Sequence, residues 1–138
     1  MNKICTDIEQ SQKLIELGID RKTSDLYYWC RSGLRIGGYR AQDEELDIPA
    51  WSLSALMKML PSEIYGETIY GDAITYKVDI RKYKLTEDVD LYQIAYGNYH
   101  WHEDGSCSWS DMINTGEKED LLDAAFEMIV WLKENKKI

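Results

Sequence analysis

The sequence predicts an α+β fold in which an antiparallel sheet of about four to six strands packs against two or three helices, in the order α-β(β)-α-β-β-β-β-α. Two observations carry this prediction. Apolar residues follow a helical period near both ends of the chain and once in between, and strand-like segments separate these stretches. The later strands are joined by turns too short for the crossover helices that a parallel sheet requires.

A first helix is expected over Asp7–Leu17. Thr6 and Glu9 have the spacing of a capping box, and Gly18 supplies a helix stop. The aromatic segment that follows predicts a strand and an antiparallel return strand, over Leu26–Arg31 and Leu34–Tyr39.

Pro49 is expected near the start of a second helix, where its missing N–H is not needed. Apolar residues recur there at i, i+3, i+4 and i+7, at Leu53, Leu56, Met57 and Leu60. Pro61 ends this run, because proline does not continue a helix.

The second half of the chain is predicted to be rich in strands, over Ile74–Tyr83, Leu91–Tyr96, Tyr99–Glu103 and Ser106–Trp109. Asp104-Gly105 is a strong signal for a two-residue hairpin turn, and Gly97 with Asn98 marks either another tight turn or a bulge. A final helix is expected over Lys118–Asn135. Its two apolar faces need cover from the sheet on one side and a second helix on the other.

Length and composition limit the classes of function. The 138 residues suit one domain, 1–138, and 25 acidic against 16 basic residues give a net charge of −9. Binding to nucleic acid or to an anionic membrane requires clustered Lys and Arg, so we expect neither. The opening residues lack the apolar core of a secretory signal, and the three cysteines have no paired spacing. We therefore expect a cytoplasmic protein without a cofactor, and leave the oligomeric state open.

One cluster of residues has the chemistry of metal ligands: His100, His102 and Cys107. If Asp104-Gly105 is a two-residue turn, His102 faces Cys107 and strand alternation places all three on one face. Two imidazoles and a thiolate suit zinc or another transition metal. Histidines on a solvent-facing strand surface explain the same pattern, and no fourth ligand is identifiable. A metal-binding module or metal-dependent enzyme is therefore the alternative interpretation.

Other catalytic signatures are weaker. A thiolate pair of Cys107 and His102 would need a carboxylate to orient the ring, and the nearby acids lie in the same tight hairpin. The chain has neither a nucleophile elbow nor a phosphate-binding loop. We therefore assign no catalytic residue.

Charge and aromatic residues point to protein binding. Residues 85–127 hold eleven acids and one base, whereas residues 21–42 hold five bases and one acid. Tyrosine and tryptophan, which are enriched at interfaces, also gather in the acidic strands. We predict partner-binding residues that face a basic protein surface: Tyr99, Trp101, Glu103, Asp104, Trp109 and Asp111. A solvated acidic face, and the suitability of tyrosine for half-buried strands, explain the same features without a partner.

Two segments, Asp47–Leu56 and Leu122–Leu132, resemble small uncharacterised proteins of phages and mobile elements of gut anaerobes. The resemblance implies a compact α+β domain and carries over no catalytic residue. By analogy with small acidic proteins of such elements, it suggests an inhibitor or adaptor that binds a host protein. The leading expectation is thus a non-enzymatic protein-binding module. A structural subunit that assembles through the second helix is a third possibility.

Overall fold

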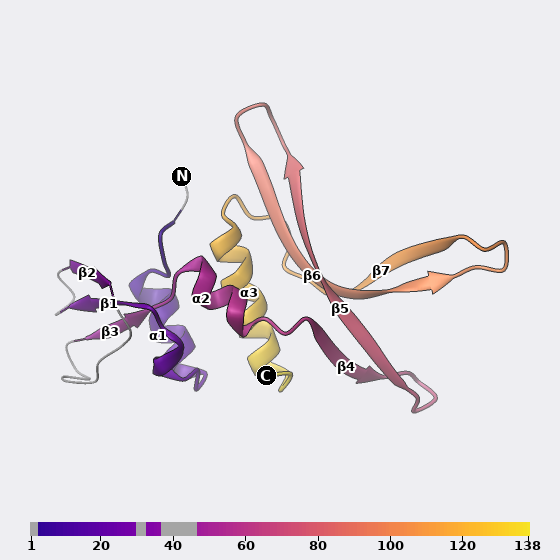
Figure 1. The fold of residues 1–138 in the computed structure, drawn as a ribbon, viewed down its shortest axis with the longest axis horizontal. Coiled ribbons are helices and arrows are strands. Elements are labelled where there is room, and N and C mark those ends of the chain that lie inside the picture. Colours follow the sequence, from indigo (N-terminus) through magenta and orange to yellow (C-terminus); the bar gives the residue numbers. More distant parts are fainter. Residues whose placement is uncertain (1–2, 30–32, 37–46) are drawn as a thin grey trace.

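The computed structural model describes residues 3–29, 33–36 and 47–138, and it confirms the α+β class. Three helices lie between two antiparallel sheets, where the sequence predicted a single sheet (Figure 1). The helices are α1 (Ile8–Glu16), α2 (Leu53–Met59) and α3 (Leu121–Glu134), with a 3-10 turn η1 (Arg21–Thr23) after α1. The smaller sheet has the order β2 (Gly33–Ile36), β1 (Leu26–Trp29), β3 (Ile48–Ala50). The larger has the order β4 (Glu63–Glu67), β5 (Ala73–Lys84), β6 (Asp90–Trp101), β7 (Cys107–Asn114).

The first helix begins one residue later than predicted, at Ile8, and its N-cap is Asp7. Asp7 and Gln10, not Thr6 and Glu9, form the capping box. Thr6 is fully buried, and its hydroxyl accepts a hydrogen bond from the backbone N–H of Trp51 at 3.1 Å. The threonine therefore ties the chain before α1 to the chain before α2.

Pro49 lies in β3, and the prediction that it opens the second helix is wrong. Pro49 pairs with Tyr27 of β1. Because β3 is an edge strand, it pairs with another strand on one side only, so a residue without a backbone N–H is tolerated there. The helix α2 begins at Leu53, where Ser52 is the N-cap. Asp25 positions that cap by accepting a hydrogen bond from the Ser52 backbone N–H at 2.9 Å.

The main core lies between α2, α3 and the larger sheet. As the sequence predicted, α3 is covered on two sides, by α2 and by β6. The largest fully buried side chains of this core are Trp51, Tyr96, Leu14, Leu56, Ile94, Leu122, Met128, Ile129 and Leu132. This packing uses one face of the larger sheet. We call the face that points away from the helices the outer face.

The strand β6 is continuous where the sequence predicted two strands. A register shift between Tyr96 and Gly97 marks a bulge, which settles the alternative that the Gly97-Asn98 pair left open. The pairing of β5 with β6 ends at Lys77 and Gly97, so beyond this point β6 pairs with β7 alone. Figure 1 shows the β6–β7 hairpin leaving the body as a separate arm.

Further differences concern a missed element and the bounds of others. The strand β4 was not predicted, and α3 begins at Leu121, where Asp120 is the N-cap, instead of at Lys118. The ends of the first two predicted strands, at Arg31 and Tyr39, lie outside the described residues. Among the described residues, no helix is long and apolar enough to cross a membrane.

Candidate functional site: the β6–β7 arm

The arm comprises residues 98–110, and its turn contains three residues, Glu103, Asp104 and Gly105. The backbone N–H of His102 donates to the Ser106 carbonyl at 2.8 Å, which closes the hairpin around them. Gly105 has a φ of 86°, the left-handed conformation that a three-residue hairpin loop requires at its last position. The predicted two-residue turn is therefore one residue too short.

This difference of one residue changes which side chains share a face. Trp101 pairs with Cys107 and His100 pairs with Ser108. Because side chains alternate along a strand, His100 and His102 lie on one face of the arm and Cys107 lies on the other. The expectation that these three residues converge on a metal is thus wrong. No group of three His, Cys, Asp or Glu residues within the described part of the chain is placed to hold a metal ion.

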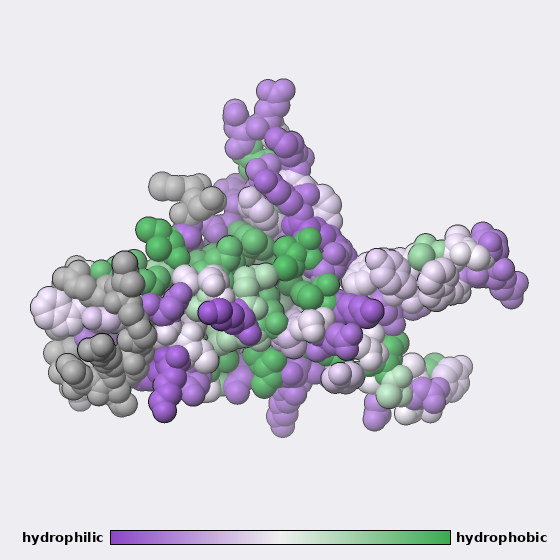
Figure 2. Space-filling model, in the orientation of Figure 1, coloured by the Kyte–Doolittle hydropathy of each residue, from purple (hydrophilic) through white to green (hydrophobic). Residues whose placement is uncertain are grey.

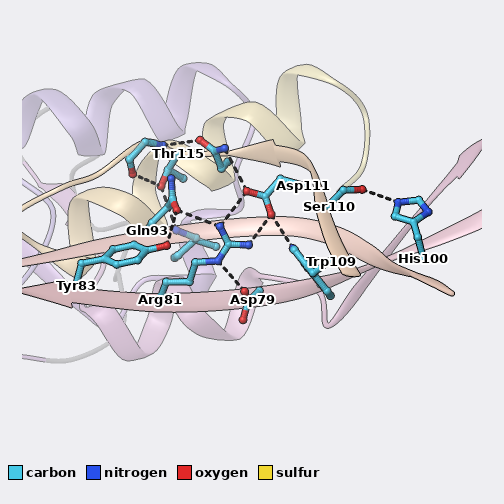
Figure 3. A network of polar contacts seen from close by, with 12 residues as sticks. Asp79, Arg81, Tyr83, Gln93, His100, Trp109, Ser110, Asp111 and Thr115 are labelled. Carbon is cyan, nitrogen blue, oxygen red and sulfur yellow. Dashed lines mark hydrogen bonds and ion pairs between the residues drawn. The ribbon is translucent and has the colours of Figure 1, made fainter. Parts of the chain in front are cut away.

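The histidines instead bond to serines across the hairpin. His100 Nε2 lies 2.6 Å from Ser110 Oγ (Figure 3), and His102 Nε2 lies 2.9 Å from Ser108 Oγ. All four residues are exposed. They behave as the polar, solvent-facing strand residues that the alternative explanation described.

An arginine-centred network fixes the base of the arm on the outer face (Figure 3). Arg81 of β5 donates from both terminal nitrogens to the carboxylate of Asp111 on β7, and from Nε to Asp79 at 2.7 Å. It also donates to Gln93 Oε1 at 3.1 Å, so the network spans three strands. The hydrogen bonds from Arg81 lower the pKa of Asp111 to about 2, helped by a bond from Trp109 Nε1 at 2.7 Å.

Trp109 packs over a glycine at the point where the arm leaves the sheet. A Cβ at Gly97 would lie 2.9 Å from the Trp109 ring and 2.2 Å from the Ser110 carbonyl oxygen, so no larger residue fits. Tyr99 contacts the same indole edge-on, with ring centroids 5.0 Å apart. The base of the arm is therefore held by packing as well as by charge.

The six predicted partner-binding residues fall into two groups. Trp109 and Asp111 have structural roles at the base of the arm, since they bond to each other and to the Arg81 network. Tyr99 and Trp101 are 58% and 76% exposed, and Glu103 and Asp104 are exposed in the turn. The available surface is thus formed by four residues: Tyr99, Trp101, Glu103 and Asp104.

Sequence reasoning missed Arg81 and Gln93. Both lie in strands that were predicted, but the β5–β6 loop has no turn signature that fixes the strand register. The observed pairing places Arg81 opposite Gln93, and the hydrogen bonds from Arg81 show that both share a face with Asp111. The available signal was an arginine at the centre of a strand in a chain rich in acids.

Two other hairpins also project from the body. Exposed apolar side chains lie near their tips: Ile69 and Tyr70 between β4 and β5, and Leu85 after β5. In Figure 2 the β6–β7 arm differs from these, because it is pale along most of its length and strongly hydrophilic at its turn. The exposed aromatic side chains of Tyr99 and Trp101 lie on this arm, next to the exposed acids Glu103 and Asp104 of its turn.

The comparisons with known proteins do not add to this picture. No protein-family model, no curated protein and no solved structure matches the chain.

Proposed function

We propose that the protein is a non-enzymatic binding module, an inhibitor or adaptor, whose arm docks on a basic surface of another protein. The exposed pair Tyr99 and Trp101 on a projecting hairpin carries this proposal. Trp101 is 76% exposed, so it contributes little to the core of this chain. Tryptophan and tyrosine, together with arginine, are enriched among the residues that dominate binding energy at interfaces.

The acidic turn supplies electrostatic complementarity. Glu103 and Asp104 follow Trp101 with only His102 between them, and the chain carries a net charge of −9. Negative charge at the tip speeds encounter with a basic partner and disfavours anionic ones such as nucleic acid. Binding is therefore expected to weaken as salt concentration rises, because these charges are exposed and screened.

The fixed base of the arm also supports binding. Ordering a flexible loop on association reduces affinity, whereas a pre-ordered one avoids that loss. The Arg81–Asp111 pair and the Trp109–Gly97 contact hold the arm before any partner arrives. An origin in a phage or mobile element, which the resemblance implies, fits an inhibitor or adaptor that acts on a host protein.

The test is a pull-down from host lysate, treated with nuclease and washed at low and high salt, with retained proteins identified by mass spectrometry. The informative variants are Trp101→Ala and the double reversal Glu103→Lys with Asp104→Lys. Asp111 is left unchanged because its loss would disturb Arg81. The proposal expects a basic protein that the wild type retains at low salt and that both variants lose.

Matched controls lie on the other hairpins. Tyr70→Ala removes an aromatic side chain that is 84% exposed, and Glu87→Lys with Asp88→Lys reverses two acids at another tip. Both controls should retain the same protein as the wild type. Equal retention by all variants, or an empty pull-down, would contradict the role assigned to the arm.

A further inference from the structure

A pocket of about 270 Å³ lies between α3 and the end of β7, away from the arm. Its lining includes Ile113 and Asn114 from β7, and Glu127, Met128, Trp131 and Glu134 from α3. Pockets for small molecules usually have volumes of about 300 to 1,000 Å³. This pocket lies near the lower end of that range, and it has room for a long side chain of a larger partner.

The lining combines an apolar interior with a carboxylate rim. Met128 is 1% exposed and Trp131 is partly buried, whereas Glu134 is exposed. Glu127, Trp131 and Glu134 are spaced at i, i+4 and i+7, so they lie along one face of α3. A long side chain with an apolar stem and a cationic end matches this arrangement of an apolar interior beneath a carboxylate rim.

The strand beside the pocket is an edge. The larger sheet ends at β7, and no further strand within the described part of the chain pairs with it. The exposed edge of a sheet binds extended peptides by adding them as another strand, and a pocket beside the edge then selects one of their side chains. Here the edge residues Ile113 and Asn114 also line the pocket.

The pocket and the adjoining edge of β7 together form a surface that we call the groove. We propose that this groove binds an extended, basic segment of a partner protein. The segment adds to the edge of β7 and places an arginine or lysine side chain in the pocket. The stem of that side chain packs on Met128 and Trp131, where a cation also gains from the indole ring, and its charge lies near Glu127 and Glu134. The groove is separate from the arm, so this proposal does not depend on the proposed function.

Two lysines of the chain itself already neighbour the rim. Lys118 Nζ lies 2.8 Å from Glu127, and Lys13 Nζ lies 3.7 Å from Glu134. These pairs are well exposed, and exposed ion pairs contribute little to stability, so a partner's cation can share or replace them. Removing Lys118 should therefore strengthen binding, an effect that a merely structural role of Glu127 would not produce.

The experiment uses the full chain labelled with ¹⁵N and three ten-residue peptides of alternating Thr and Val with Arg, Leu or Glu at the centre. The arginine peptide should shift the indole N–H signal of Trp131 and the amide signals of Ile113 and Asn114. Signals of β4, the other edge strand, should stay in place. Affinity should fall in the order Arg, Leu, Glu.

Variants then test each contact. Glu127→Gln should weaken binding of the arginine peptide by about two- to fivefold, the change expected from one exposed ion pair, and Glu134→Gln should act similarly. Lys118→Met should tighten it by a similar factor. The control Glu87→Gln removes one charge at a distant hairpin tip and should leave the affinity unchanged.

Several results would overturn the proposal. An absence of shifts at Trp131, or a leucine peptide that binds as well as the arginine peptide, contradicts the cationic occupant. Equal binding by free N-acetylarginine amide contradicts the added strand. Shifts confined to residues 98–110 would assign the peptide to the arm. If the signals of β7 shift with protein concentration when no peptide is present, the groove binds a second copy of the chain instead.

Discussion

Replacing Asp111 with Asn should destabilise the protein in a way that depends on pH. The carboxylate accepts hydrogen bonds from both terminal nitrogens of Arg81, and its side chain is only 21% exposed. These contacts lower the pKa of Asp111 from its ordinary value of 3.8 to about 2. At about 1.4 kcal/mol per pKa unit, and discounted for solvent screening, the ionised carboxylate contributes about 1 to 2 kcal/mol to the free energy of unfolding.

The sign of the pH dependence follows from the lowered pKa. The contribution is complete above the unfolded-state pKa, near pH 4 and higher, and it is lost as the pH falls toward 2, where the folded carboxylate becomes protonated. The free energy of unfolding of wild type and Asp111→Asn, measured by urea denaturation from pH 2 to 7, should therefore differ most above pH 5. The difference should shrink steadily below pH 4.

A matched control is Glu87→Gln, which removes a charge from an exposed hairpin tip. Its unfolding free energy should follow the wild type within about 0.5 kcal/mol at every pH. A difference between wild type and Asp111→Asn that is the same at pH 3 and pH 7 would refute the ion-pair explanation. So would the absence of any difference at pH 7.

Three further predictions concern the arm and the cysteines. Gly97→Ala should lower the unfolding free energy by about 1 to 3 kcal/mol, because its Cβ would meet the Ser110 carbonyl oxygen at 2.2 Å; a neutral result in urea denaturation would contradict the close packing. Trp101→Ser should change that free energy by less than about 0.5 kcal/mol, since its ring is 76% exposed; a larger loss would mean that the ring has a structural role. Cys107 is exposed, whereas burial raises the pKa of the Cys5 thiol, so iodoacetamide at pH 8 should alkylate Cys107 much faster, as peptide mass mapping would show. Equal rates would contradict the burial of Cys5.

The sequence predicted the class of fold because its helices have strong apolar periods. It could not place Pro49, because β3 becomes an edge strand only by pairing with β1, which lies more than twenty residues earlier in the sequence. Its error at residues 103–105 is of a different kind. Asp104-Gly105 fits both a two-residue turn and the end of a three-residue turn, and only the strand pairing distinguishes them.

The length of this turn determines which side chains face one another in the candidate site. With the shorter turn, Cys107 faces His102 and suggests a metal, whereas with the observed turn it faces Trp101. The exposed aromatic and acidic residues of the arm were predictable from composition and alternation. The role of Asp111 was not, because its partner Arg81 is thirty residues away and two strands across the sheet. The acids of the second half are likewise not a single surface, since Asp120 caps α3 and Asp123 pairs with Lys3.

The most direct test of the arm as a binding surface is the affinity of the protein retained in the pull-down, purified and titrated against wild type, Trp101→Ala and Tyr70→Ala. Trp101→Ala should weaken binding by about tenfold or more, the loss typical of an aromatic residue at the centre of an interface. Tyr70→Ala should bind like the wild type, and all affinities should fall with salt. Equal affinity of wild type and Trp101→Ala would show that the arm is not the binding surface.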